Sequence, residues 1–470
     1  MSRAYAPVAL LVGSYVAWNL YLCWKMYYGY GYPPFDLAIF DQGLWLLSHL
    51  HAPFVTIMGR NLFGDHASLI LLLVAPFYRL VPEPQGILVL QTLSLAAASA
   101  PIFVLAKKMT HSTMIATVLV GVYLLNPALQ QGNLEQFHPE ALQVLIISVA
   151  IYAAVESRGA LLGVMVVLAL LVKEDAAALV VPLGLWVLIR RDRRWGLSII
   201  AGAVAWALVA NLAIIPTLLG TNSFYASRIP FGGLWGLLRT VASSPIQFIS
   251  YLRSSTRLFY VWQMGFSTGW IFLLAPEIAA IALLALVENV ISLDPYMHQI
   301  LYHYSMPLVP VLVIGTAFAI GAQKSERRRN VATAIVVVSA LVSSILWGLA
   351  PFSRTTVYPT WSPDSATTAA IGTMERSIPS TAVVVAWYPL VTHLDHRSGI
   401  YVWPNPFYAE NWGLGTNTGA RLASASDVQY LMLPDPLNVT ENPDVFRWIA
   451  RAFRLMHRAD GIGLYRRITP

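Results

Sequence analysis

Long apolar runs alternate with short polar segments along most of the chain, up to about residue 350. A helix needs about 20 mostly apolar residues to cross the hydrocarbon core of a bilayer. The chain up to residue 351 is therefore predicted to be an all-α polytopic membrane domain with about eleven transmembrane helices. These spans are placed near residues 7–28, 86–106, 112–130, 140–156, 159–173, 175–190, 196–218, 257–275, 276–292, 304–322 and 331–350.

Two further apolar stretches, residues 38–50 and 68–80, are too short or too interrupted to span a bilayer comfortably. The first contains Trp45, and the second contains Phe77 and Tyr78. Aromatic side chains are enriched where a membrane meets water. We therefore predict two interfacial helices that lie against the membrane within the first long external loop.

The pattern changes after Trp347, because residues 352–470 carry Pro, Ser, Thr, Asp and Arg in the proportions of a soluble protein. Short strand-like runs alternate there with helix-like segments near 364–377 and 443–453, which is typical of a small α/β domain. The strand-like runs are Ala382–Trp387, Gly399–Trp403, Val428–Leu433 and Ile462–Tyr465. The sequence thus predicts two domains, a membrane domain at 1–351 and a soluble α/β domain at 352–470.

Composition and charge support a multi-pass protein of the cell (plasma) membrane. Of 470 residues, 57% are hydrophobic and 11% are charged, whereas soluble domains carry about 25% charged residues. The net charge of +7 comes from short basic clusters between apolar runs, at 107–108, 190–194 and 324–329. Basic clusters of this kind mark cytoplasmic loops, so no nucleic-acid partner is expected. Counting spans then places the N-terminus in the cytoplasm and the α/β domain outside.

Four short acidic motifs fall on the outer side of this topology. Ionisable residues at or near membrane depth are costly and usually have a function. Acidic groups from four separate segments on one face therefore predict an active site. The motifs are Asp36 through Asp41, Asp65-His66, His138-Pro139-Glu140 and Lys173-Glu174-Asp175.

The first two motifs each precede a predicted interfacial helix. Asp36 is expected either to cap the helix at 38–50 or to act as a general base or metal ligand, and the two roles are compatible. Asp41 is roughly 140° away around that helix, which favours a supporting role. Asp65 could also be a helix cap, but capping does not require His66, a group that titrates near neutrality.

The other two motifs lie between predicted spans. Pro139 and Glu140 suit the first turn of a helix, while His138 belongs either to a solvated loop or to a ligand site. Lys173-Glu174-Asp175 interrupts a long apolar stretch. It is either a turn at the external face or the lining of a wet cavity, where Lys173 would be a partner for phosphate.

Later external segments add further candidates for the site. Arginine side chains there could contact a phosphate, and a carboxylate and a histidine stand near the ends of predicted spans. Most such residues would be ordinary interfacial residues. These candidates are Arg228, Arg253, Arg257, Glu288 and His303.

The motif series resembles an uncharacterised family of prokaryotic polytopic membrane proteins. The residues that carry this resemblance are Phe35–Gln42, Asn61–His66, Phe137–Leu142, Val172–Ala176 and His303-Tyr304. That family is similar to the C-type glycosyltransferases, which use polyprenyl-phosphate sugars as donors. The resemblance implies a catalytic acid in the first external loop, between two interfacial helices. Asp36 occupies that position, and Asp65 matches a second acidic position.

The resulting hypothesis is a membrane glycosyltransferase of the cell envelope. It would move a sugar from a polyprenyl-phosphate donor to a glycan, lipid or protein acceptor on the outer face. Asp36, Asp65 and His66 are the predicted catalytic residues. The predicted substrate-binding residues are Asp41, His138, Glu140, Lys173, Glu174, Asp175, Arg228, Arg257, Glu288 and His303.

A metal is optional in this chemistry, because the leaving group is already a phosphate. Mg²⁺ or Mn²⁺ at Asp36 and Asp65 is the candidate addition. The main alternative is a transporter or flippase that uses the same acids for ions or substrate, although the sequence lacks the repeated halves of many transporters. A non-catalytic assembly protein is a third alternative, which the charged Lys173-Glu174-Asp175 motif disfavours.

Overall fold

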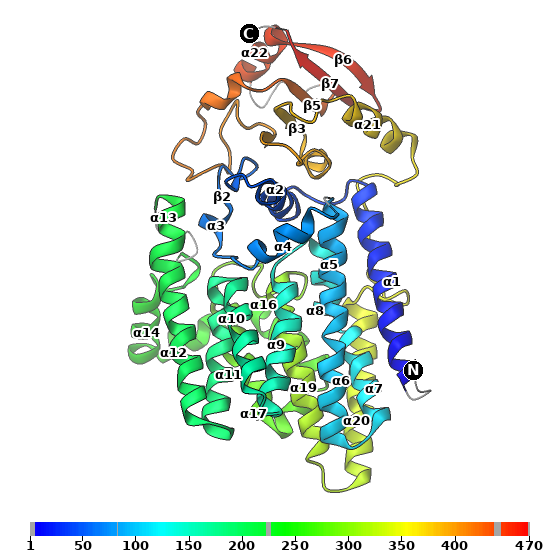
Figure 1. The fold of residues 1–470 in the computed structure, drawn as a ribbon, viewed down its shortest axis with the longest axis vertical. Coiled ribbons are helices and arrows are strands. Elements are labelled where there is room, and N and C mark those ends of the chain that lie inside the picture. The colour runs from blue at the N-terminus through cyan, green and yellow to red at the C-terminus, as the bar shows by residue number, and fades with distance from the viewer. Residues whose placement is uncertain (1–4, 82, 222–226, 437–442, 469–470) are drawn as a thin grey trace. The chain divides into compact units, whose positions relative to one another are not determined.

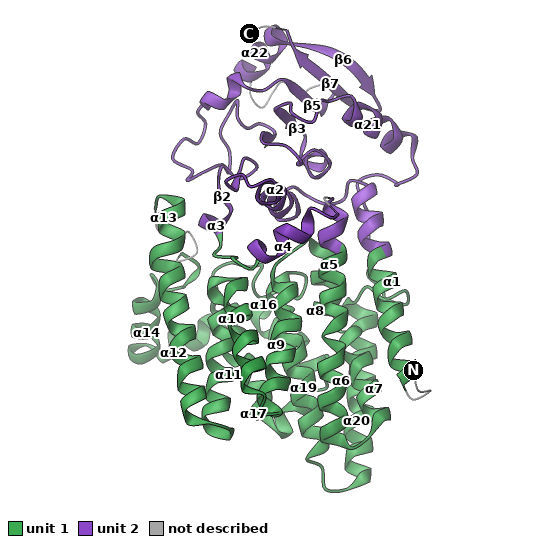
Figure 2. Cartoon of the chain, viewed as in Figure 1, with its two compact units in different colours: residues 1–20, 66–70, 89–356 green, residues 21–65, 71–88, 357–470 purple. Residues whose placement is uncertain are grey.

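The computed structural model describes residues 5–81, 83–221, 227–436 and 443–468. Contacts divide the chain into two compact units, which Figure 2 shows in different colours. The first unit comprises residues 1–20, 66–70 and 89–356, and the second comprises residues 21–65, 71–88 and 357–470. The second unit therefore combines the C-terminal region with segments of the first predicted external loop. The boundary predicted at residue 351 assigns these two parts of the chain to different domains.

Helices are the only regular secondary structure among the described residues of the first unit (Figure 1). Helices α1 (Ala6–Tyr28) and α5 (Pro84–Ala97) begin or end in the second unit. The others are α6 (Ser99–Thr110), α7 (Thr113–Leu124), α8 (Pro127–Glu135), α9 (Glu140–Val155), α10 (Gly159–Val172), α11 (Ala177–Arg190), α12 (Arg193–Val209), α13 (Ile215–Leu219), α14 (Leu234–Ser243), α15 (Pro245–Leu252), α16 (Ser255–Phe266), α17 (Pro276–Ala279), α18 (Leu283–Ile291), α19 (Leu308–Gly321) and α20 (Glu326–Trp347). Short 3₁₀ or π segments are η2 (Glu174–Ala176), η3 (Ala210–Ile214), η5 (Ile271–Leu274), η6 (Ala280–Ala282) and η7 (His303–Ser305).

Five helical segments among the described residues are long and apolar enough to cross a membrane. They are Ala6–Tyr28, Pro84–Thr110, Arg193–Leu219, His303–Gly321 and Glu326–Trp347. The pair α7 and α8, bent by 43°, would make a sixth span. The shorter apolar helices α9 and α10 lie where two further spans were predicted. A polytopic helical membrane protein is thus confirmed, while the number eleven stays a prediction.

The region predicted as two continuous spans, 257–292, is instead broken into the short helices α16, α17 and α18. Gly269 and Trp270 follow α16 with φ of +60° and +58°. Two consecutive residues with positive φ cannot continue a right-handed helix. Apolar composition alone carries no signal for this break, which is why the sequence predicted longer helices.

Packing in the first unit is closest around α19 and between α11 and α12. Helix α19 is apolar on all sides, as expected of a helix at the centre of a bundle, and it packs against α6, α7, α9 and α17. Between α11 and α12, a Cβ on Gly196 would lie 2.4 Å from the Cα of Leu188. Only glycine permits this close approach of the two helix backbones.

The second unit contains a five-stranded mixed sheet with strand order β4-β3-β5-β7-β6. Strand β3 pairs in parallel with β4 and β5, whereas β7 runs antiparallel to β5 and β6. The strands are β3 (Val384–Ala386), β4 (Ile400–Val402), β5 (Tyr430–Pro434), β6 (Phe453–Ala459) and β7 (Ile462–Arg467). The four predicted strands and the predicted α/β character are confirmed, and β6 is additional.

Helices and short segments complete the second unit around this sheet. Buried residues of the sheet, including Val385, Leu431 and Leu433, share one apolar core with Ile449 of α22. The remaining elements are α2 (Leu37–Ser48), β1 (Phe54–Val55), β2 (Arg60–Asn61), α3 (Leu62–Asp65), α4 (Leu71–Tyr78), α21 (Ala366–Arg376), η8 (Tyr388–His393), η9 (Ala423–Ser426) and α22 (Pro443–Ala452). Helices α2 and α4 match the two predicted interfacial helices, and they pack against each other.

The outer edge of β4 is closed by a residue from the first part of the chain. The Thr56 hydroxyl donates to the carbonyl of Ile400 at 2.8 Å and accepts from the backbone N–H of Ile400 at 3.0 Å. Gln42 in turn donates to the Thr56 hydroxyl at 2.9 Å and to the carbonyl of Arg397 at 3.0 Å. The segments 37–61 and 395–402 are therefore joined by buried hydrogen bonds.

Candidate functional site

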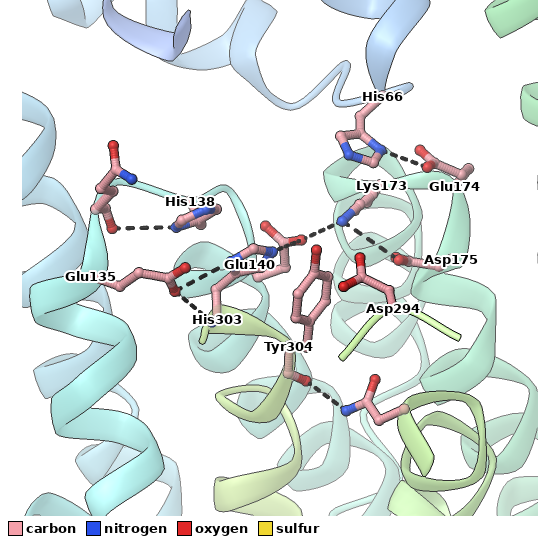
Figure 3. Close-up of polar contacts among 12 residues, drawn as sticks. His66, Glu135, His138, Glu140, Lys173, Glu174, Asp175, Asp294, His303 and Tyr304 are labelled. Atoms are coloured by element: carbon pink, nitrogen blue, oxygen red, sulfur yellow. Dashed lines mark hydrogen bonds and ion pairs between the residues drawn. The ribbon is translucent and has the colours of Figure 1, made fainter. Parts of the chain in front are cut away.

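A cluster of charged side chains lies within the first unit, where several helix ends meet (Figure 3). Glu135 ends α8, Glu140 begins α9, and the segment 173–175 separates α10 from α11. The 3₁₀ segment η7 contributes His303 and Tyr304. We call this group, together with His66, His138, Arg228 and Asp294, the helical-unit cluster. Helix ends leave backbone groups without intrahelical partners, so they are suited to hold polar side chains and ligands.

Lys173 is the central cation of the helical-unit cluster and is 3% exposed. Its ammonium group donates to Glu140 at 2.7 Å and lies 3.6 Å from a carboxylate oxygen of Asp175. It also lies 5.4 Å from the ring centre of Tyr304, within range of a cation–π contact. The charge of Lys173 is therefore already compensated within the protein, which weakens the prediction that it binds phosphate directly.

His66 and Glu174 form a second pair beside Lys173 (Figure 3). The His66 Nδ1 atom lies 2.7 Å from Glu174, and the backbone N–H of Ala67 donates to the other carboxylate oxygen at 3.1 Å. Burial opposes ionisation of Glu174, but His66 and Lys173 outweigh it and lower the pKa of this carboxyl to about 2. Glu174 is thus held as a carboxylate that orients the His66 ring.

The imidazole rings of His138 and His303 stack with their centres 3.6 Å apart. Glu135 accepts a hydrogen bond from the backbone N–H of His303 at 2.7 Å, and its oxygen lies 3.3 Å from His303 Nδ1. Gln91 holds the backbone N–H of His138 at 2.9 Å. Ligand atoms of Glu135, His138 and His303 lie within 4.8 Å of one another, so this group could hold a metal ion.

Arg228 and Arg257, both predicted to contact phosphate, have different partners. Arg228 pairs with Asp294 at 3.1 Å and donates to the Tyr304 hydroxyl at 3.4 Å. Arg257 instead donates to the backbone carbonyls of Val290 at 2.7 Å and of Ser292 at 3.0 Å. Arg228 thus belongs to the helical-unit cluster, whereas Arg257 mainly holds the end of α18.

Acids outnumber permanent cations in the helical-unit cluster. Its carboxylates, which are labelled in Figure 3, are Glu135, Glu140, Glu174, Asp175 and Asp294. Its permanent cations are Lys173 and Arg228. Glu288 on α18 lies within electrostatic reach of Asp175 and adds to the excess. An excess of buried acid attracts cations or protons, so an anionic ligand here would need a bridging cation or a protonated histidine.

Asp36 lies in the second unit and has an unusual backbone. It stands at the start of α2 with φ 79° and ψ −75°, and its side chain makes no capping hydrogen bond. These angles are those of a γ-turn, a rare and strained conformation for a residue other than glycine. The capping role considered from the sequence is therefore absent. Strain of this kind is concentrated at functional sites.

The other acids of the first external loop have local partners within the second unit. Asp65 pairs with Arg60 at 3.4 Å, whereas the neighbouring His66 pairs with Glu174. The two predicted catalytic residues therefore have different partners. Asp41 is fully buried and accepts a hydrogen bond from Tyr78 at 2.7 Å. Its other oxygen lies 2.6 Å from His396 Nε2, which fits the predicted supporting role.

Sequence reasoning missed three residues that the structure brings to these two groups. Glu135 joins the helical-unit cluster, and Asp395 and His396 join Asp41. The run Asp395-His396-Arg397 follows a largely apolar stretch from residue 382. That density of charge is the signal that could have identified it, as it identified Lys173-Glu174-Asp175.

The family model described as "Predicted membrane protein (DUF2079)" matches residues 27–448. Among solved structures, ArnT from Cupriavidus metallidurans bound to undecaprenyl phosphate is similar to this chain, with a TM-score of 0.56 and 12% identity over 98% of each chain. The apo state of ArnT gives a TM-score of 0.55 and 13% identity over 99% of this chain and 98% of that chain. No curated protein matches the sequence significantly. At such identities the likeness concerns the fold.

Proposed function

Because this chain belongs to the DUF2079 family of predicted membrane proteins and has the fold of ArnT, we propose that it is a membrane glycosyltransferase. It moves a sugar from a polyprenyl-phosphate donor to a glycan, lipid or protein acceptor. The observation that carries this proposal is the whole-chain likeness to a protein that binds undecaprenyl phosphate, over 98% of both chains. A likeness that included only the helices would be compatible with many membrane functions.

Asp36 is the proposed general base. Glycosyl transfer to a hydroxyl group needs a base that removes the acceptor's proton as the new bond forms. The strained backbone of Asp36, and a side chain that does not cap α2, support a role other than stabilising that helix. Asp65, which is paired with Arg60, is better suited to orient groups around the acceptor than to take a proton.

The helical-unit cluster is the proposed site for the donor's phosphate. Departure of the polyprenyl phosphate needs positive charge near the leaving oxygen. Arg228 and His66 can supply it at the margin of the cluster, while Lys173 organises the buried acids. The acid excess supports a divalent cation here, and Glu135, His138 and His303 would offer one carboxylate and two imidazoles, a set that suits Mn²⁺ better than Mg²⁺, which prefers oxygen ligands.

Transfer of radiolabelled sugar by the purified full chain tests this function. The substrates are a panel of polyprenyl-phosphate sugars, and Asp36→Asn is the diagnostic variant. Asp460→Asn is a matched control, because Asp460 also has positive φ, 47°, in a turn of the second unit. We expect transfer with at least one donor, its loss by about 100-fold or more in Asp36→Asn, and near-normal transfer in the control. Full activity of Asp36→Asn would remove this residue from the mechanism.

A transporter or flippase is the second candidate, favoured by the buried acid-rich cluster within the helical unit and by the broken helices α16–α18. Folded protein that transfers no sugar from any donor, but takes up an ion in vesicles, would support it. Uptake that disappears when Glu140 and Lys173 are replaced together would show that the helical-unit cluster takes part in ion transport.

The active face is proposed to be extracytoplasmic, with the N-terminus in the cytoplasm. The basic loops at 107–108, 190–194 and 324–329 support this orientation. A tag added after Pro470 should react with a membrane-impermeant label in intact spheroplasts, and a tag before Met1 should react only after lysis. The opposite labelling pattern would contradict the orientation and the use of an externally presented donor.

A further inference from the structure

A compact group of titratable side chains lies in the second unit, separate from the helical-unit cluster. Asp41 comes from α2, and Asp395 and His396 come from the loop before β4. His396 Nε2 lies 2.6 Å from an oxygen of Asp41 and 3.9 Å from an oxygen of Asp395. One potential ligand atom from each of the three lies within 4.8 Å of the others.

Two buried carboxyl groups in this position lack sufficient counter-charge. Asp41 is 0% exposed and Asp395 is 1% exposed. The Oδ2 atom of Asp395 has no hydrogen-bond partner in the part of the chain that the structure describes. Removing a carboxylate from water costs several kcal/mol unless it is paired and hydrogen-bonded. Something that is positively charged is therefore expected at this oxygen.

The neighbouring arginine does not fill this role. The Arg397 guanidinium donates to the backbone carbonyls of Leu394 at 2.5 Å and of Ala382 at 3.2 Å. Its hydrogen bonds are thus used to hold the loop that carries Asp395 and His396. A rigid loop next to an unsatisfied carboxylate is the arrangement expected of a preorganised ligand site.

From this geometry we propose that Asp41, Asp395 and His396 bind a divalent first-row cation, Zn²⁺ or Mn²⁺. Two carboxylates and one imidazole are donors that both ions accept, with water in the remaining positions. The Tyr78 hydroxyl lies 2.7 Å from Asp41 Oδ1 and 2.8 Å from His396 Nε2, so it helps to hold both of these proposed ligands in place. The His396 side chain is 28% exposed, which gives an ion a path to the site.

The competing arrangement is a proton shared between the two aspartates. Burial and the neighbouring Asp41 raise the pKa of Asp395 well above its usual value, so that in the absence of a cation a proton would take its place. The two arrangements differ in a measurable way, because only the first binds metal with defined stoichiometry. The proposed ion would also link α2 to the loop before β4, whether or not the protein transfers a sugar.

The test uses the purified full chain, stripped with a chelator and then titrated with Zn²⁺ and with Mn²⁺. Bound metal is measured by mass spectrometry after dialysis, and the melting temperature is recorded in parallel. Apart from any ion held by the helical-unit cluster, we expect about one ion per chain that raises the melting temperature, and an affinity loss for this ion of about 100-fold in Asp395→Asn. His396→Gln, at a partly exposed position, provides a second variant if Asp395→Asn does not fold.

Glu135→Gln serves as the matched control, because Glu135 belongs to the other group of candidate ligands. Retention of the ion in this variant, together with its loss in Asp395→Asn or His396→Gln, would support the proposed site. Loss of the ion in Glu135→Gln alone would assign the metal to the helical-unit cluster and overturn the proposal. Folded wild-type protein that binds no ion would overturn it in favour of the shared proton.

Discussion

The two units stabilise buried acids in different ways. In the helical-unit cluster, Lys173 is a permanent cation that lies between Glu140 and Asp175. Beside it, Glu174 is held as a carboxylate with a pKa of about 2. In the second unit, the only side chain paired with Asp41 and Asp395 that can carry a positive charge is a titratable histidine, among the described residues. There burial raises the pKa of Asp395.

The difference teaches which kind of chemistry each unit can support. A permanent cation favours the ionised form of an acid beside it, as Lys173 does for Glu174 in the helical-unit cluster. Acids without such a cation respond to pH and to metal ions instead. The first arrangement is suited to holding a charged substrate, and the second to a site whose charge depends on its surroundings.

The largest expected effect comes from removing the central cation. Lys173→Met would leave Glu140 and Asp175 buried without their counter-ion and should lower the free energy of unfolding by about 3–5 kcal/mol. The double variant Lys173→Met with Glu140→Gln should lose less than the single variant, because the paired charges are removed together. Melting curves in detergent measure both, and a double variant that loses the sum of two large effects would contradict the pairing.

A smaller effect is expected in the second unit. Tyr78→Phe removes the hydroxyl that donates to Asp41 at 2.7 Å. A buried acceptor that loses one hydrogen bond costs about 1–3 kcal/mol, which is less than an unpaired charge. Tyr358→Phe, at a residue that is 78% exposed, is the control. If Tyr78→Phe destabilised the chain as much as Lys173→Met, the contrast between the two regions would be lost.

A third expected effect is a pH dependence of the second unit. Burial raises the pKa of Glu375, which accepts a hydrogen bond from Tyr30 at 3.0 Å, to about 8 from 4.5. Between these pH values the folded chain holds a proton that the unfolded chain has released, so stability should fall as pH rises from 4.5 towards 8.

Glu375→Gln should flatten this slope, because glutamine keeps a hydrogen-bonding oxygen without a titrating proton. Exposed Glu410 provides the control Glu410→Gln, which should leave the slope unchanged. Melting temperatures recorded from pH 5 to pH 8 provide the measurement. An identical slope in wild type and Glu375→Gln would mean that other groups are responsible.

Much of the fold could be predicted because its signals are local. The motif series identified a family of polytopic membrane proteins, which the match to DUF2079 confirms, and the chain has a fold similar to that of ArnT. The four predicted strands of the α/β region are also present. Strand β6 was missed because its middle residues, from Arg454 to Arg458, are exposed and largely polar, which does not give the pattern of a half-buried strand.

The site was only partly predictable because its partners are distant in sequence. Lys173 stood out as a charge within an apolar stretch, yet its contact with Glu140 depends on how α9 and α10 pack. Asp41 and His396 are 355 residues apart. No local pattern encodes a pair of this kind, so Asp41 was expected to have a supporting role without its partner being known.

The hydrogen bonds between Thr56 and Ile400 have a consequence for how the chain is made. The two residues are 344 positions apart, and the segment between them includes most of the membrane helices. During synthesis, residues 37–61 must therefore wait until those helices have been made before they can close the edge of β4. An open strand edge is a template for pairing with other chains. We infer that residues 352–470 made alone would self-associate, because the Thr56 hydroxyl that covers the edge of β4 belongs to the first sixty residues of the same molecule.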